Sequence, residues 1–438
     1  MLEPLLDSPI FRRLFAAQVL ALIGTGLMTV ALALLAFELA PDRAGTVLGT
    51  ALAIKMIAYV GVSPFAGLVV ARFGRKRVMI AADLARMAMI GLMPFVSQVW
   101  QIYVLIFVLQ SASAVFTPTF QATIADLFDN EENYTKALVL SRLAFDLEAL
   151  VSPLIAAVLL SSVSFSLLFV GTSFGFACSA LLVASAAVPW RYDVAGRDWR
   201  RATLGVRLFK QTPRLNGIML MNVVIAAAGS MILVNTVVYV QGFLGGTEQQ
   251  TALAFALAGA GSLVAAITLQ PLLNQFSDRT IMLAGAALQT LALFIGIFSP
   301  PFFGLLAIWL IAGFGGGLSL TPVGRVLRRS AAEADREAVF AAQFGLSHLA
   351  WMFTYPLAGW LGTSIGMSGS FLVLTAICSL ALIAALMIWP TKDEPALDHV
   401  HNDLPPDHPH LTGAVRTPDG FRHAHTFVID ALHHRWPR

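Results

Sequence analysis

Long apolar runs of about 20 residues recur along the chain and are separated by short polar segments. A run of that length crosses the hydrocarbon core of a bilayer when it folds as an α-helix. We count twelve such runs and predict an all-α membrane protein with twelve transmembrane helices. The predicted spans are residues 14–39, 46–70, 78–97, 102–124, 138–161, 164–188, 214–241, 250–272, 280–299, 302–323, 339–364 and 369–390.

The composition excludes an ordinary soluble domain. Hydrophobic residues make up 57% of the 438 residues and charged residues only 12%, whereas about a quarter of the residues in soluble domains are charged. The first residues, MLEPLLDSPIFRR, lead into a full-length span without a small-residue cleavage site, so we expect no cleavable signal peptide. The two cysteines match no metal or redox spacing and are expected to be packing residues.

Lysine and arginine are distributed unevenly between alternate loops, and this distribution predicts the orientation. One set of loops, together with the termini, holds 24 of the 28 basic residues, whereas the opposite set holds only Arg43. We therefore expect a multi-pass protein of a bacterial-type inner (plasma) membrane with both termini in the cytoplasm. The net charge of +3 reflects this bias, and no pattern of interleaved aromatic and basic residues indicates a nucleic-acid partner.

An internal repeat relates the two halves of the chain. Pro9 recurs as Pro213, and Pro118 recurs as Pro322, in both cases 204 residues later. Parallel repeats of this kind are typical of transporters with a substrate path between the halves. We expect Pro118 and Pro322 to bend their spans at a gate, or else only to help curved helices pack. The predicted domains are an N-terminal six-helix bundle (1–189), a cytoplasmic linker (190–212), a C-terminal six-helix bundle (213–390) and a histidine-rich cytoplasmic tail (391–438).

The loop after the second predicted span reads GLVVARFGRKRVMI and covers residues 67–80. It resembles the signature loop of the major facilitator superfamily, although Ala71 stands where that family has an acidic residue. The resemblance implies a latch that holds one state of the transporter, with Asp126 as the candidate acidic partner. We expect Gly67 to allow close helix packing and Gly74 to allow a tight turn. The residues that match the loop are Gly67, Arg72, Gly74, Arg75 and Lys76.

Within that superfamily the chain looks most like the drug:proton antiporters. The segment FDLEALVSPLIAAVL in the fifth span resembles their antiporter motif, with Ser152-Pro153 and Ala156-Ala157 in place of the usual glycine-rich pairs. Small residues here let the helix pack tightly on a neighbour. Phe107 stands where the family has an arginine in the fourth span, so the resemblance does not extend to the usual proton-coupling route.

Several ionisable residues fall inside predicted spans, where they indicate functional sites. Lys55 lies near the middle of the second span, and Arg142 and Asp146 are four residues apart and are expected to pair. Glu148 is then the candidate carboxylate that binds a proton or contacts a cation, with Lys55 as its counter-charge. The alternative is a structural ion pair between the two spans. His348 is expected either to carry protons or to pack as a hydrogen-bonded histidine.

Eight of the nine histidines lie in the tail, mostly as pairs separated by one residue. Histidines at such a spacing project to one side of an extended chain, so each pair can offer two imidazoles to one ion. We expect the tail to be too polar to form a core, with nearby aspartates completing a metal site. The final FVIDALHHRWPR is expected to dock as a short amphipathic turn. The candidate metal ligands are His399, His401, His408, His410, His423, His425, His433 and His434.

Histidine-rich cytoplasmic tails resemble those of nickel and cobalt exporters in the same superfamily. The leading hypothesis is a proton-coupled exporter of a divalent transition metal of the nickel or cobalt type, or of its small chelate. One alternative is a multidrug or siderophore exporter with a regulatory tail, and another is a membrane metal sensor that transports nothing. We expect no enzyme activity, no required cofactor apart from a divalent metal bound by the tail, and function as a monomer in the lipid bilayer.

Overall fold

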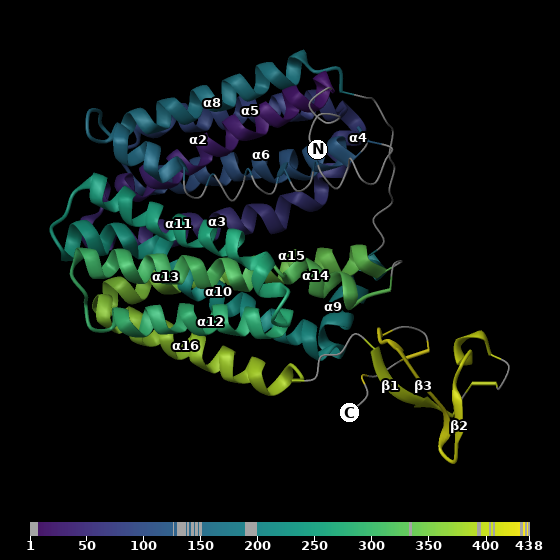
Figure 1. The fold of residues 1–438 in the computed structure, drawn as a ribbon. Helices are drawn as coiled ribbons and strands as arrows, with labels where there is room; N and C mark the ends of the chain where they lie inside the picture. Colours follow the sequence, from purple (N-terminus) through teal and green to yellow (C-terminus); the bar gives the residue numbers. More distant parts are fainter. Residues whose placement is uncertain are drawn as a thin grey trace.

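The computed structural model describes most of the chain, and the figures draw the remaining residues as a grey trace. The described residues are 8–125, 127–128, 137, 140–141, 144, 148, 151–188, 199–332, 335–391, 396–402, 404–405, 408–429, 432–433 and 436. They form two bundles of helices that lie one above the other in Figure 1, and a small sheet outside them.

The N-terminal bundle contains long apolar helices joined by short turns (Figure 1). Its first helix begins at the repeat proline Pro9, and the side chain of Ser8 caps it by accepting a hydrogen bond from the amide of Phe11 (3.3 Å). The elements of this bundle are α2 (Pro9–Leu39), η1 (Pro41–Arg43), α3 (Ala44–Val62), η2 (Ser63–Phe65), α4 (Ala66–Phe73), α5 (Arg75–Leu92), η3 (Met93–Phe95), α6 (Val99–Ala125) and α8 (Ser166–Ser185).

The C-terminal bundle repeats the arrangement, and its first membrane helix begins at the second repeat proline, Pro213. A proline suits the first position of a helix because the amide missing there would have no partner inside the helix. The elements are α9 (Trp199–Gln211), α10 (Pro213–Val237), a π-helical turn η4 (Val238–Phe243), α11 (Glu248–Leu273), α12 (Asp278–Gly296), α13 (Phe302–Leu320), α14 (Val323–Arg329), α15 (Arg336–Ser364) and α16 (Gly366–Ile388).

Ten helices among the described residues are long and apolar enough to cross a membrane. They match ten of the twelve predicted spans. The predicted span 339–364 corresponds to α15, a continuous helix of 29 residues. Part of the predicted span 138–161 lies outside the described residues, while its second half, 151–161, is described and begins as helix. Pro118 lies inside the continuous helix α6, whereas Pro322 lies at the break between α13 and α14. The segment predicted as a linker contains α9, which packs on α15 through Gly205.

The two bundles meet at the end where α3 begins and α15 ends. A Cβ atom added to Gly359 of α15 would lie 2.1 Å from the carbonyl oxygen of Gly45 in α3, so the two backbones are in direct contact. Thr46 donates a hydrogen bond to the carbonyl oxygen of Gly359 (3.2 Å). At the same end, Gln249 of α11 donates to the carbonyl oxygen of Leu160 in the other bundle. These contacts close this end of the molecule.

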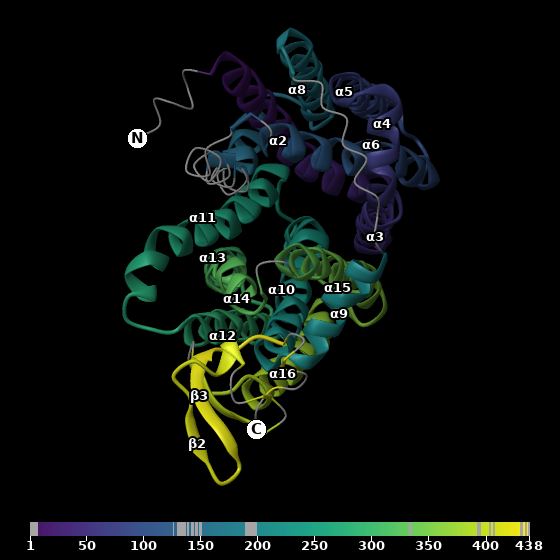
Figure 2. The same cartoon turned by 90° about the vertical axis from the view of Figure 1, so that its right-hand side faces the viewer.

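The tail forms a three-stranded antiparallel sheet, which the sequence did not predict. The strands β1 (Ala396–His401), β2 (Val415–Thr417) and β3 (Gly420–Thr426) are ordered β1-β3-β2, and a short helix η6 (Pro409–Leu411) precedes β2. Figures 1 and 2 show the sheet outside the helices, beside the C-terminal bundle. The buried Phe427 and Ile429 extend the apolar core of that bundle, so the body supplies the apolar contacts that the tail lacks.

Candidate functional site

A cavity of about 580 Å³ lies between the two bundles. It is lined by α2, α3, α5, α6 and α8 on one side and by α10, α11, α12, α13 and α15 on the other. Its wall reaches Gln121 and Leu320, near the ends of α6 and α13 that lie away from the closed end. The cavity is also lined by Pro153 and Tyr355. They belong to two equivalent pairs, Ser152-Pro153 and Tyr355-Pro356, which lie 203 residues apart in the sequence.

Two side chains of opposite charge line the cavity. Lys55 of α3 and Glu148 both line it, as the prediction of a transport site requires. Glu148 reaches the wall because Gly26 of α2 leaves room, since a Cβ atom added there would lie 2.4 Å from Oε1 of Glu148. The sequence analysis did not identify Gly26. Arg142 and Asp146 lie outside the described residues, so their pairing stays a prediction.

The third charge at the cavity, Arg86, is held within the N-terminal bundle. Its guanidinium pairs with Asp83 and lies 4.1 Å from the ring centre of Phe116 and 4.6 Å from that of Phe176. Ser179 donates to the other carboxylate oxygen of Asp83 (2.8 Å). Paired charges of this kind hold a bundle together, so Lys55 and Glu148 are the better candidates for substrate contact.

The rest of the described lining is apolar, aromatic, hydroxyl-bearing or amide-bearing, and none of it is histidine or cysteine. Trp351, Tyr355 and Phe255 supply rings from the C-terminal bundle, while Gln18, Gln110 and Gln289 supply amides. Asn222 and Gln343 are not among the described lining residues and form a buried reciprocal pair with both bonds at 3.1 Å.

His348 lies on α15 and is not among the described lining residues. Its Nδ1 donates to the carbonyl oxygen of Phe344 (2.7 Å), and its ring lies 6.0 Å from that of Tyr59 on α3. These contacts favour the packing interpretation of His348 over proton transfer.

Of the two glycines predicted to have structural roles in and before the loop between α4 and α5, one has its predicted role and the other does not. Gly74 adopts φ +82°, a backbone conformation that favours glycine, and it forms the predicted tight turn. A Cβ atom added to Gly67 would meet no atom within 4 Å, so the prediction that this glycine permits close helix packing was wrong. Asp126 lies outside the described residues, and the predicted latch with Arg75 remains a prediction.

The C-terminal bundle has a charge cluster at the corresponding place, which the sequence analysis missed. Asp278, at the first position of α12, lies 3.3 Å from Nε of Arg325 and 3.9 Å from Nη2 of Arg329, both on α14. The repeat offset of 204 residues places Asp278 opposite Gly74. Adding 204 to the residue numbers of the signature loop would have pointed to Asp278. In this bundle the acidic residue lies at the end of the loop and the arginines lie on α14, the reverse of the predicted latch between Arg75 and Asp126.

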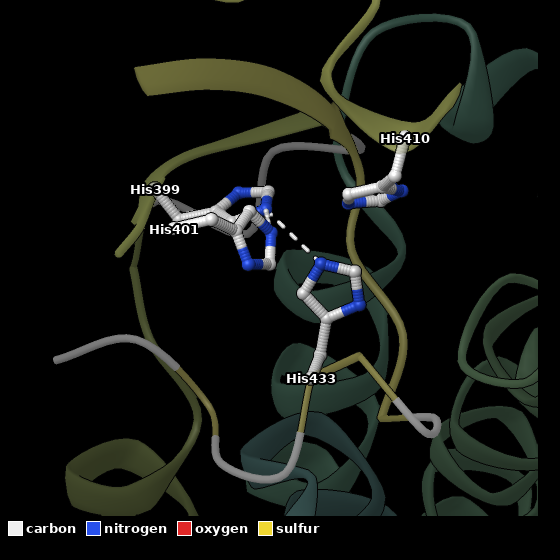
Figure 3. A group of neighbouring side chains, drawn as sticks. All are labelled: His399, His401, His410 and His433. Atoms are coloured by element: carbon white, nitrogen blue, oxygen red, sulfur yellow. Dashed lines mark hydrogen bonds between the residues drawn. The ribbon is translucent and has the colours of Figure 1, made fainter. Parts of the chain in front are cut away.

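Four tail histidines form the second candidate site (Figure 3). His399 and His401 come from one face of β1, His410 comes from η6, and His433 comes from the segment after the sheet. One nitrogen from each lies within 4.8 Å of the others. Nε2 of His399 lies 3.1 Å from Nε2 of both His401 and His433. In a tetrahedral site with bonds of about 2.0–2.1 Å, ligand nitrogens lie about 3.3 Å apart, so the arrangement fits one ion.

A hydrogen bond sets the tautomer of His399. Its Nδ1 lies 3.0 Å from the carbonyl oxygen of Leu397, which can only accept, so Nδ1 carries the proton. Nε2 is then left with a lone pair that faces the other imidazoles. Histidines that bind a metal through one ring nitrogen commonly donate a hydrogen bond from the other ring nitrogen to a backbone carbonyl.

The pairwise prediction holds for His399 and His401 but not for His408 and His410. His410 and His408 belong to one predicted pair, but only His410 joins the four, while Nδ1 of His408 accepts from the amide of His410 (3.2 Å). The ring of His423 packs 4.7 Å from that of His399. His434 and the side chain of His425 lie outside the described residues. Segments far apart in the sequence therefore share one site.

Asp398 does not complete this site, although the sequence suggested a carboxylate ligand. Strand alternation places it on the face of β1 opposite His399, and its carboxylate pairs with Arg422. The hydrogen bonds from Arg422 hold the pKa of Asp398 below its ordinary value. Four imidazoles fill a tetrahedral shell without it.

Comparison with known proteins agrees with this architecture. The family model described as Major Facilitator Superfamily matches residues 14–213 and 218–421. The chain is 25% identical over 401 residues to an uncharacterized MFS-type transporter, YfiS, of Bacillus subtilis (strain 168), covering 84% of this chain and 92% of that protein. It is 26% identical over 184 residues to macrolide efflux protein A of Streptococcus pyogenes, covering 41% of this chain and 45% of that one.

Solved structures show the same fold at low identity. The nucleoside transporter NupG matches with a TM-score of 0.65 and 13% identity, covering 86% of this chain and 97% of that one. A D-xylose-proton symporter matches with a TM-score of 0.65 and 15% identity, covering 86% and 97%. The duplicated bundles, the central cavity and the family match agree, and the chain belongs to the major facilitator superfamily.

Proposed function

We propose that the protein is a secondary exporter of a divalent transition metal of the nickel or cobalt type, carried as a hydrated ion or a small chelate. The four-histidine cluster carries this proposal, because imidazole suits these metals and the predicted orientation places the tail in the cytoplasm, where export begins. In the same orientation, the contact between Gly45 and Gly359 closes the periplasmic side. The cavity then faces the cytoplasm, ready to load.

The size and lining of the cavity support a hydrated or chelated ion rather than a bare one. Its volume of about 580 Å³ is far larger than the roughly 30 Å³ that one water occupies in the liquid, so the cavity has room for an ion together with its hydration shell or a small chelator. Among the described lining residues, Glu148 is the one carboxylate, and amides such as Gln110 offer neutral oxygens. Few strong ligands favour release of the ion on the far side.

Glu148 and Lys55 provide a route for coupling to protons. A cation and a proton both neutralise the Glu148 carboxylate, so the two compete for the same place in the cavity. Lys55 disfavours a second positive charge while Glu148 is neutral. Exchange of one cation for one proton therefore follows from occupancy of this single carboxylate, and the two bundles rock about it.

Measurement of cell metal content tests the proposal. We expect bacteria that express the full chain to hold less nickel or cobalt than a matched strain without it, and to survive higher concentrations of the metal. Equal nickel, cobalt, zinc and copper contents in the two strains, with the protein present in the membrane, would rule out metal export.

A second candidate function is export of an apolar organic molecule. The rings of Trp351, Tyr355 and Phe255 favour it, as does the similarity to a macrolide efflux protein over 184 residues. Resistance to macrolides or hydrophobic dyes on expression, without change in cell metal, would select this function. A protein that changes neither metal nor drug content but binds metal would instead be a sensor.

A further inference from the structure

We propose that the tail is a metal-dependent clamp on the start of α10, and that its four-histidine site holds a regulatory ion rather than cargo. The proposal depends on the proposed function only for the class of ion, a divalent transition metal that prefers imidazole. The observations that carry it are the closed set of ligands, the position of the site and one buried arginine.

The ligand set suits an ion that stays bound. Four protein ligands fill a tetrahedral shell and leave no open position, which distinguishes structural zinc sites from catalytic ones. His401 and His433 are 5% and 4% exposed, so an ion between them is shielded from solvent. None of the four histidines lines the cavity between the bundles. A metal held here lies off the described transport path.

Arg214 connects this site to the transporter body. It is the second residue of α10 and is only 1% exposed. Its Nη2 donates to the carbonyl oxygen of Phe427 (2.9 Å), directly after β3, and its guanidinium lies 4.7 Å from the ring centre of Trp436. Both tail residues therefore hold one side chain of α10.

Phe427 also touches the histidine cluster and Trp436. The ring of Phe427 lies 4.6 Å from that of His433, 5.0 Å from that of His399 and 5.1 Å from that of Trp436. His433 is three residues before Trp436, so an ion that fixes His433 also fixes the segment over Arg214. Metal binding therefore joins β1, η6 and His433 at one ion and tightens the hold of Phe427 and Trp436 on α10.

The clamp acts at a place that affects transport. The segment predicted to link the two halves leads through α9 into α10. Further along, α10 lines the cavity with Ile225, Gly229 and Leu233. A bound ion therefore stabilises the orientation of α10 seen here, in which the bundles meet at the Gly45–Gly359 end. Metal in the cytoplasm is thereby coupled to the conformation that loads substrate.

Hydrogen exchange on the full chain in detergent, with zinc ions as the probe, tests the clamp. Peptides that cover α9 and the first turns of α10 (199–218) report the hold on the body, and tail peptides report the site itself. Where opening requires metal release, free zinc at about 100 times its dissociation constant slows exchange about 100-fold. Zinc bound per chain is measured on the same samples.

Four variants separate binding from transmission. His401→Gln removes a ligand, and His408→Gln is its matched control, because His408 lies in the same tail but outside the four. Arg214→Gln and Trp436→Ala leave all four ligands in place but break the contact with α10. The second of these changes the tail alone, so it remains informative if Arg214→Gln fails to fold.

We expect the wild type and His408→Gln to bind one zinc and to protect both the tail and residues 199–218. His401→Gln loses both effects, whereas Trp436→Ala and Arg214→Gln keep the zinc and the tail protection but lose protection of 199–218. Protection of 199–218 that survives in both contact variants overturns the clamp, as does absence of zinc binding in the wild type. No transport is measured, so failure of metal export leaves this result standing.

Discussion

The central cavity and the tail site differ in how they would treat a metal ion. The cavity offers one carboxylate and one lysine in about 580 Å³, with no histidine among the described lining residues. The tail site gathers four imidazole nitrogens within 4.8 Å, and two of the four histidines, His401 and His433, are buried. Weak, spacious coordination allows release, whereas a closed shell of strong ligands retains the ion. The difference is the basis of our proposal that one site transports and the other senses.

The largest expected effect comes from removing the one carboxylate of the described cavity wall. Glu148→Gln should abolish export, so that cells expressing it hold as much nickel as cells without the protein, because neither the cation nor the proton finds a charge there. Zinc binding by the tail should not change. The matched control is Glu248→Gln at the start of α11, which should retain export. Normal export by Glu148→Gln would move coupling to another residue.

The next effect concerns the tail ligands. His401→Gln should weaken zinc binding by about 100-fold or more, because loss of a mere outer-shell partner costs about 10–100-fold. His408→Gln should bind nearly as the wild type does, and calorimetry on the full chain measures both. Equal losses in the two variants would mean that the tail binds metal as a loose polyhistidine segment.

The contact that closes the two bundles is expected to be sensitive to added volume. Gly359→Val should destabilise the closed end by about 1–3 kcal/mol, because its Cβ would overlap the carbonyl oxygen of Gly45. Accessibility of a thiol label at Val47→Cys, which lies two residues after Gly45 and is 5% exposed, measures the opening. Gly345→Val on the same helix, where a Cβ meets no atom within 4 Å, is the control.

A smaller effect is expected at the charge cluster of the C-terminal bundle. Asp278→Asn should lower thermal stability by about 1 kcal/mol, because Arg325 is 58% exposed and solvent screens much of the attraction. Asp335→Asn, which changes the residue directly before α15, provides a comparison for loss of one negative charge. A change no larger than in that comparison would show that the cluster contributes nothing.

The smallest effect belongs to the exposed Asp398–Arg422 pair. Because the folded state lowers the pKa of Asp398, the pair stabilises the sheet above the ordinary aspartate pKa and loses that contribution as pH falls through the lowered value. Asp398→Asn should therefore remove a slight acid dependence of tail exchange without changing zinc binding. An altered zinc affinity would indicate that Asp398 supports the histidine site.

The membrane helices were predictable because their signal is local. Apolar runs of bilayer length gave most of the helices, and the repeated Pro9 and Pro213 marked equivalent helix starts. Gly74 was likewise predictable, since a positive φ at a turn is a property of one residue. Lys55 and Glu148 were found because charges are rare in apolar spans.

The tail was harder to predict because its stability depends on distant residues. The alternation in ALDHVH and GFRHAHT favours strands, but too few apolar residues accompany it to form a core alone. Phe427 is buried against the body, and Arg214 holds it from more than 200 residues away in the sequence. The joint site of His399, His410 and His433 arises only once those segments are placed together.

Nickel uptake into inverted membrane vesicles tests the central claim most directly. An imposed proton gradient, acidic inside, should drive radioactive nickel into vesicles that contain the wild-type protein, and collapse of the gradient should release it. Vesicles with Glu148→Gln should show no uptake above protein-free vesicles. Uptake that does not depend on the proton gradient, or that persists in Glu148→Gln, would contradict proton-coupled metal export through this cavity.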